Sequence, residues 1–357
     1  MGFVTAILEI IIFLILLGIV LLFFTNIPEQ FGIHVFSPIT ISNQGPPVLF
    51  TSTTSVPQPP ESAALSYALT IINKNRSEYG LPNVSYVNVS GQQHADSMLR
   101  YGYFSHWDPA GMKPYMRYTL LGGTQSVQEN VAYEYNSSGI NVINALKQME
   151  YNMMYNDAQC CNNGHRDNIL TPQHNQVSIG VAYNKTTIYF VEDFINNYIS
   201  WAGSAPSYNN NGDVVVAGAA QNGYSVQSVE VSYDSPVAPL SKSQLAATSE
   251  YSYGQTIAGI GYSNGLSTFY YPNITTVYAS KYQVNGNNFD IEFNIRNLTK
   301  QYGAGEYTIM VSLTNATGPA QGQCTVTGIV KKCNTFLAAT YTLFLNSSGA
   351  RFTPSNV

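Results

Sequence analysis

The chain has 357 residues, a formal net charge of −5, and charged side chains at only 10% of its positions. This length allows about two domains and some shorter segments, because one domain takes roughly 150 residues. The sequence has no basic cluster, which argues against a nucleic-acid-binding protein. Its polar character comes instead from Asn, Ser, Thr, Gln and 27 Tyr, a composition common among exported proteins.

Residues 3–24 are almost wholly apolar and predict a transmembrane helix. At 1.5 Å per residue they span about 33 Å, enough to cross a hydrocarbon core of ~30 Å. A cleaved signal peptide would have a basic start and a shorter apolar run, yet no Lys or Arg precedes Lys74. We therefore favour an uncleaved signal anchor at the cell membrane, with the rest of the chain outside the cell. Glu9 either reaches the membrane interface or contacts a partner helix.

Residues 25–61 are rich in Pro, Ser and Thr and show no sustained periodicity. Such a composition predicts a semi-extended linker between the membrane and the folded part of the chain.

Residues 62–201 mix helical and strand patterns and predict the first folded domain. Leu65, Leu69 and Ile72 recur at helical spacing until Gly80 and Pro82 interrupt the pattern. Two more helices are expected at 92–101 and 141–155, two strands at 177–183 and 187–194, and Trp201 is expected to close the domain.

Residues 202–357 predict an all-β domain. Phe289, Ile291 and Phe293 alternate with polar residues, and similar alternation occurs at 229–233 and 307–313. Alternation with a period of two indicates strands with one buried face, as in antiparallel sheets. We expect a β-sandwich, with an immunoglobulin-like arrangement as one form of it.

Several short motifs in the first domain are individually weak but follow one another in a characteristic order. They are Ile72-Asn73-Lys74-Asn75-Arg76, His94-Ala95-Asp96-Ser97-Met98, Gly102-Tyr103-Phe104-Ser105-His106, Gly111 to Arg117, Glu129-Asn130-Val131-Ala132, Gly164-His165-Arg166-Asp167-Asn168-Ile169-Leu170 and Ile179-Gly180-Val181.

By these motifs the stretch 62–201 resembles the CAP superfamily (cysteine-rich secretory protein, antigen 5, pathogenesis-related 1), in its prokaryotic form. The resemblance implies an α-β-α sandwich with a large cleft, so the whole chain would be an α+β protein. In many relatives, two His and one or two Glu line the cleft and hold a divalent metal. His106, Glu129 and His165 match three of these positions, and Glu150 is the only carboxylate on the helix that would supply the fourth.

Two imidazoles and a carboxylate suit Zn²⁺ or another divalent metal, and three protein ligands would leave one position open. Alternatively, His106 and His165 form a polar network across the cleft without metal. Arg166 and Asn168 are interpreted as structural donors and His94 as a scaffold residue.

Four cysteines allow three pairings. Cys324 and Cys333 flank a short segment and predict a hairpin disulfide, which suits an oxidising exterior. For the adjacent Cys160 and Cys161 there are four alternatives: a vicinal disulfide, free thiols, pairing with another cysteine, or a role as soft metal ligands. Of these we favour the vicinal disulfide.

The sequence leaves three functions open. The first is a surface module that binds a lipid, glycan or peptide in the cleft; the second is a structural or adhesive envelope protein. The third, a metal-dependent hydrolase of surface peptides or glycans, is disfavoured because no His-Glu-x-x-His motif occurs. Sites for N-glycosylation of an exported protein start at Asn75, Asn83, Asn88, Asn136, Asn184, Asn273, Asn297, Asn315 and Asn346.

Overall fold

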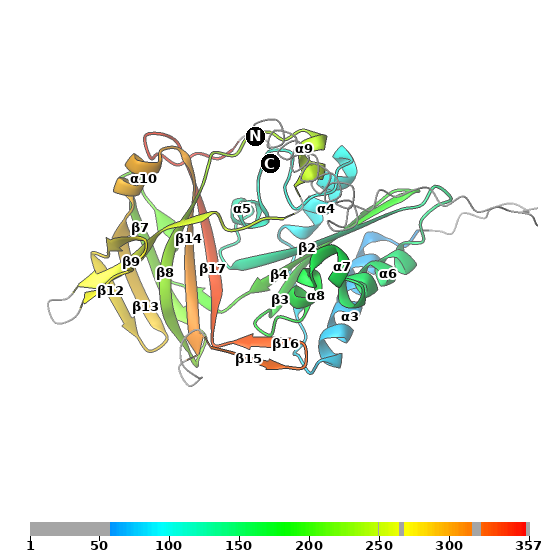
Figure 1. The fold of residues 1–357 in the computed structure, drawn as a ribbon, viewed down its shortest axis with the longest axis horizontal. Helices are drawn as coiled ribbons and strands as arrows, with labels where there is room; N and C mark the ends of the chain where they lie inside the picture. The colour runs from blue at the N-terminus through cyan, green and yellow to red at the C-terminus, as the bar shows by residue number, and fades with distance from the viewer. Residues whose placement is uncertain (1–57, 249, 264–267, 316–322, 355–357) are drawn as a thin grey trace, which may run out of the picture. The chain divides into compact units, whose positions relative to one another are not determined.

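The computed structural model describes residues 58–354, apart from 249, 264–267 and 316–322 (Figure 1). The predicted signal anchor and all but the end of the predicted linker lie outside these residues. Within the described part, no helix is both long enough and apolar enough to cross a membrane. The described residues form one compact unit, within which we distinguish an N-terminal region (58–196) and a β region (199–354).

The N-terminal region is built on a sheet of strands β1 (Ser85–Tyr86), β3 (Gln176–Tyr183), β4 (Thr187–Asn196) and β2 (Ser126–Tyr135), in the order β1-β3-β4-β2. Strands β3 and β4 form a tight hairpin because the Asn184 side chain accepts hydrogen bonds from the backbone N–H groups of Thr186 and Thr187. Both strands cover the spans that the sequence predicts.

Helices cover both faces of this sheet (Figure 1). On one face, Ile188, Phe190 and Phe194 of β4 pack in a core with residues of α3 (Glu61–Glu78), α6 (Val142–Tyr155) and α8 (Gly164–Ile169). On the other face, Tyr189 and Val191 pack with residues of α4 (Gly91–Tyr101). Helix α5 (Pro114–Leu120) contacts β2, and the short helix α7 (Ala158–Cys161) precedes α8.

The predicted helices end where local chemistry requires it. Helix α4 ends at Gly102, which adopts φ 62°, a left-handed conformation that glycine tolerates best. Helix α6 begins after Asn141, whose side chain accepts a hydrogen bond from the backbone N–H of Asn144. Capping residues therefore explain why these two boundaries could be read from the sequence.

The β region contains two sheets that share one hydrophobic core. One has the order β10-β9-β8-β14-β17, with β11 paired to β9, and the other has the order β12-β13-β7-β5, with β6 paired to β7. Alternating residues of both sheets, such as Val229 and Val231 of β8 and Ile291 of β13, are buried between them. The strands are β5 (Ile199–Trp201), β6 (Ser207–Tyr208), β7 (Asp213–Ala220), β8 (Tyr224–Asp234), β9 (Gln255–Ser263), β10 (Thr268–Phe269), β11 (Thr275–Tyr278), β12 (Lys281–Asn285), β13 (Asn288–Asn294), β14 (Gly305–Asn315) and β17 (Thr335–Leu345), with helix α10 (Arg296–Tyr302) between β13 and β14.

Mixed helix and sheet followed by a β-rich region is therefore the architecture of the chain, as predicted. The immunoglobulin-like arrangement stays a prediction. Trp201, expected to close the first domain, lies on a strand that pairs with β7, so the chain enters the β region by Ile199.

Segment 235–254 of the β region packs against the N-terminal region. It follows β8 and returns across the surface of the N-terminal region. Its helix α9 (Lys242–Ala247) buries Leu245 against the core formed by α4, and Tyr251 and Tyr253 pack against the core around α5. Strand β17 also contacts α5 and β2. The sequence gives no sign that this segment leaves the β region.

The predicted disulfide between Cys324 and Cys333 is confirmed. It joins strands β15 (Cys324–Thr327) and β16 (Val330–Cys333), which form a hairpin of their own. The carbonyl of Cys333 accepts a hydrogen bond from Gln173, which attaches the hairpin to the N-terminal region.

Candidate functional site

A cavity of about 610 Å³ opens between the N-terminal region and segment 235–254. Its lining combines amide, imidazole, carboxyl and tyrosine side chains and comes from both regions. The lining residues are His106, Gln128, Glu129, Asn130, Cys160, Cys161, Gly164, His165, Asp167, Asn168, Thr171, Glu250, Tyr251, Ser252 and Tyr253.

Three of the four residues predicted as metal ligands line this cavity, although the sequence separates them widely. His106 follows α4, Glu129 lies on β2, and His165 is the second residue of α8. Strand β2 passes beside α8, which carries His165, and beside the segment after α4 that carries His106. The fold thereby brings the three side chains to one cavity.

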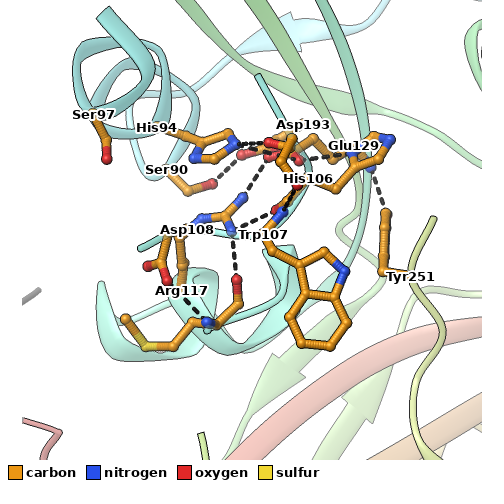
Figure 2. Close-up of polar contacts among 12 residues, drawn as sticks. Ser90, His94, Ser97, His106, Trp107, Asp108, Arg117, Glu129, Asp193 and Tyr251 are labelled. Carbon is orange, nitrogen blue, oxygen red and sulfur yellow. Dashed lines mark hydrogen bonds and ion pairs between the residues drawn. The ribbon is translucent and has the colours of Figure 1, made fainter. Parts of the chain in front are cut away.

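Glu129 is the centre of a buried network at one side of the cavity (Figure 2). One carboxylate oxygen lies 2.9 Å from Nδ1 of His106, and the other accepts a hydrogen bond of 2.7 Å from Arg117. The backbone N–H of Glu129 donates to the Tyr251 hydroxyl over 2.9 Å, so segment 235–254 is part of the network. The side chain of Glu129 is fully buried.

Burial sets the ionisation of this network. It raises the pKa of Glu129 to about 7, against the opposing effect of the Arg117 charge. Burial, together with Arg117, lowers the pKa of His106 to about 4, so that imidazole is neutral at pH 7. A neutral His106 and a carboxyl that titrates near neutrality can share a proton between them.

His94 lies behind this network and is almost completely buried. Its Nε2 is 2.9 Å from the carbonyl oxygen of Ser105, and burial lowers its pKa well below the usual value. These contacts fit the scaffold role expected from the sequence.

His165 also lines the cavity and is held by Asp157. Its Nδ1 is 2.6 Å from one carboxylate oxygen of Asp157, and its backbone N–H donates to the other oxygen over 2.9 Å. The carbonyl of His165 accepts a hydrogen bond from the side chain of Asn130. Asp157 therefore holds the ring of His165 through Nδ1, and Asp157 and Asn130 together hold its backbone.

Residues 69–194 match the model of the cysteine-rich secretory protein (CAP) family. These residues form a CAP domain. Three of the motifs that carry the resemblance in the sequence supply residues of the cavity wall. These residues are His106 after α4, Glu129 and Asn130 on β2, and Gly164, His165, Asp167 and Asn168 on α8.

Two solved structures are also similar. One is an extracellular protein containing an SCP domain from Bacillus anthracis strain Ames, with 22% identity, a TM-score of 0.31, and coverage of 40% of this chain and 45% of that one. The other is the CAP domain of enterococcal PrgA, with 13% identity, a TM-score of 0.27, and coverage of 53% and 65% respectively. Each match thus spans less than two thirds of the similar chain. No curated protein matches the chain.

Glu150, the fourth predicted ligand, does not line the cavity of the CAP domain. It is buried beneath the sheet, where Asn75 of α3 donates a hydrogen bond of 2.6 Å to it. Burial raises the pKa of Glu150, and both burial and Glu150 raise that of Glu192 on β4. Two facing carboxyl groups can form a hydrogen bond only when one of them carries a proton. Glu150 and Glu192 therefore form a buried pair with a structural role.

Whether a metal fits depends on which ligand atoms at the cavity are free to bind it. Each carboxylate oxygen of Glu129 already has one protein partner, His106 or Arg117, so a metal would use the remaining lone pairs of that carboxylate. In the described part of the chain, one set of three or more metal-binding side chains has its donor atoms within 4.8 Å of one another: Asp157, Cys160, Cys161 and His165. Zinc binding by His106, Glu129 and His165 therefore stays a prediction.

Several site residues were missed by the sequence reasoning. Asp157 and Asp193 lie outside the quoted motifs, and Tyr251 lies in the β region. Arg117 ends the Gly111–Arg117 motif, so its position was marked although its role was not. Only the three-dimensional arrangement connects these residues to His106 and Glu129.

Proposed function

We propose that this protein is an extracellular CAP-domain protein, anchored in the cell membrane by residues 3–24, that binds a glycan in the cavity next to His106 and His165. The observation that carries the proposal is the cavity itself, whose walls come from the CAP domain and from segment 235–254. Its size lies within the range of about 300–1,000 Å³ of ligand sites.

The lining favours a glycan over the lipid and peptide alternatives. Among the residues that line the cavity there is no Leu, Ile, Val, Met or Phe, so it offers no aliphatic side chain against which an acyl chain could pack. Gln128, Asn168 and Glu250 supply hydrogen-bonding groups for sugar hydroxyls. Tyr251 and Tyr253 supply aromatic surface with a polar end, which suits the mixed polar and apolar faces of a sugar ring.

An extracellular location is supported by the disulfide between Cys324 and Cys333, because such bonds persist in oxidising surroundings. The apolar run at residues 3–24 would hold the chain at its membrane, and the linker would place the cavity within reach of surface glycans. Protease added to intact cells should release the folded part. Complete protection of the chain would rule out this orientation.

Binding is tested with the full chain purified in detergent and soluble fragments of cell-surface glycans, using calorimetry. We expect saturable binding that Tyr251→Ala and Gln128→Ala each weaken by about 10-fold, because each removes one contact surface. The matched control is Tyr151→Ala, which removes an exposed tyrosine on α6 outside the cavity and should leave the affinity unchanged.

Equal affinity of the Tyr251, Gln128 and Tyr151 variants would exclude the cavity as the binding site. Binding of peptides but not glycans would show that the ligand of the cavity is a peptide. Fragmentation of the glycan during the experiment would instead favour the hydrolase alternative.

A further inference from the structure

Four side chains with metal-binding atoms come together at the cavity, and three of them line it. Donor atoms of Asp157, Cys160, Cys161 and His165 all lie within 4.8 Å of one another. Two sulfurs, an imidazole nitrogen and a carboxylate oxygen are all zinc ligands. In a tetrahedral zinc site with bonds of about 2.0–2.3 Å, donor atoms lie roughly 3.3–3.8 Å apart, so this set is compact enough to meet at one ion.

The local sequence explains why these side chains converge. Asn162 and Asn163 adopt φ angles of 49° and 65°, and these two left-handed residues reverse the chain between α7 and α8. The Asp157 carboxylate fixes the returning chain by accepting from the backbone N–H groups of His165 and Arg166, at 2.9 and 3.2 Å. The turn therefore brings the cysteines at the end of α7 beside His165.

The two sulfurs form a disulfide in this structure, so they bind no metal in that state. Cys160 is exposed and Cys161 half-buried, which gives an external thiol access to the bond. Reduction by two equivalents of a small thiol yields two cysteine thiols and one small-molecule disulfide. Binding of Zn²⁺ to both sulfurs then releases two protons, because thiolates are the ligands.

We propose that Cys160, Cys161, His165 and Asp157 form a zinc site that opens when the vicinal disulfide is reduced. Oxidation closes the site by joining its two sulfur ligands, and reduction restores them. Because Cys160, Cys161 and His165 also line the cavity, zinc would bind within its wall. The site shares His165 with the predicted set around His106 and Glu129 but takes its other three ligands from Asp157, Cys160 and Cys161. It does not depend on glycan binding.

The second disulfide provides the matched control. Cys324 and Cys333 lie on the β15–β16 hairpin, which is not part of the donor set, although their thiols would also appear on reduction. Replacing this pair by serine leaves only the vicinal pair as a source of thiols. The Cys160–Cys161 pair can likewise be replaced by serine with little change in volume.

The test uses the full chain in detergent, reduced with dithiothreitol, freed of it without oxygen and titrated with zinc chloride. We expect one zinc per reduced chain and at least 100-fold weaker binding to the oxidised chain. Cys324→Ser/Cys333→Ser and His106→Ala should keep the site, Cys160→Ser/Cys161→Ser should lose it, and Asp157→Asn should weaken it about 10-fold or more.

A second readout measures the rate at which iodoacetamide alkylates the two thiols of Cys324→Ser/Cys333→Ser. One equivalent of zinc should slow this rate at least 10-fold, as metal-bound thiolates are shielded. Equal zinc affinity of the oxidised and reduced chains, retention of the site in Cys160→Ser/Cys161→Ser, or its loss in His106→Ala would overturn the proposal. An alkylation rate unchanged by zinc would do so as well.

Discussion

Glu129 on β2 and Asp193 on β4 are paired across two neighbouring strands, and both carboxyl side chains are buried. Burial raises the pKa of Asp193 well above its usual value, and the neighbouring Glu129 raises it further. Arg117 supplies a positive charge to Glu129. Because carboxylates only accept hydrogen bonds, the pair is stable when one of its members holds a proton.

The stability of the protein should depend on pH through Glu129. Its pKa rises from 4.5 to about 7 on folding, so the folded chain binds the proton more tightly than the unfolded chain does. The resulting stabilisation is fully present below about pH 4.5 and is lost as the pH rises through 7, an effect on the order of 3 kcal/mol. Glu129→Gln should remove this dependence, which urea unfolding at pH 5 and pH 8 would measure.

His106 contributes with the opposite sign. Its pKa falls to about 4 on folding, so its contribution is lost as the pH drops from 6.5 to 4. Wild type and Glu129→Gln both retain His106, so its contribution cancels in a comparison of the two. The informative quantity is therefore the difference between their free energies of unfolding at each pH. If this difference is the same at pH 5 and pH 8, Glu129 does not titrate as described.

Arg76 should be one of the most important structural side chains of the CAP domain. It is fully buried and donates hydrogen bonds to the carbonyl oxygens of Pro82, Ile169, Thr171 and His174, thereby joining α3 to the chain after α8. Arg76→Met leaves these acceptors unpaired and should lower the free energy of unfolding by about 3–5 kcal/mol.

The matched control is Arg100→Met, which changes an exposed arginine on α4 and should cost less than about 0.5 kcal/mol. Thermal unfolding of the two variants beside wild type provides the comparison. Equal losses would mean that the contacts of Arg76 contribute little.

The sequence predicted those features whose cause is local. Helix α4 and the strands β3 and β4 follow from residue patterns and from Gly102, and the CAP domain follows from a series of motifs. The position of Glu150 could not be predicted, because a carboxylate on α6 can face either the cavity or the core. Its contact with Asn75, 75 positions away, depends on how α3 packs against α6.

The contribution of the β region to the site was also beyond the sequence. Tyr251 reaches Glu129 because segment 235–254 returns to the CAP domain, and nothing in its composition distinguishes it from a surface loop. Asp157 illustrates the same limit on a shorter scale. Its contacts with His165 require the chain reversal at Asn162 and Asn163, and left-handed residues cannot be located from periodicity.

The contact between the two regions should depend on Asp234 at the end of β8. One carboxylate oxygen is 2.6 Å from the Lys113 ammonium group, the other accepts from the Tyr115 hydroxyl, and Lys113 also donates to the carbonyl of Ser252. Lys113 is 5% exposed. Asp234→Asn leaves a buried ammonium group without its counterion and should cost about 3 kcal/mol.

Asp290→Asn is the control for this change. It removes the partner of Lys281 in a pair whose side chains are each about one-third exposed, and it should destabilise the protein much less than Asp234→Asn does. Limited proteolysis gives a second readout, since Asp234→Asn should speed cleavage within segment 235–254. Similar cleavage rates in the two variants would exclude a role for Asp234 in holding this segment.

The packing of α4 on the sheet requires glycine at position 180. A Cβ atom there would overlap with the carbonyl of Gly91, the first residue of α4, and a Cβ at Gly91 would overlap with the carbonyl of Ser178. Backbone atoms form both obstacles, so no side chain can rotate away. The close approach lets the hydroxyl of Ser178 accept from the backbone N–H groups of Val89, Ser90 and Gly91, each at 3.1 Å.

Gly180→Ala should therefore separate α4 from β3 and lower the free energy of unfolding by about 3 kcal/mol or more, at the upper end of overpacking effects. Gly164→Ala is the control, because a Cβ there meets no atom within 4 Å and the change should stay within about 1 kcal/mol. Hydrogen exchange locates the effect: Gly180→Ala should speed exchange at the amides of residues 89–91, whereas Gly164→Ala should not. Unchanged exchange at these amides would show that α4 does not depend on the close contact.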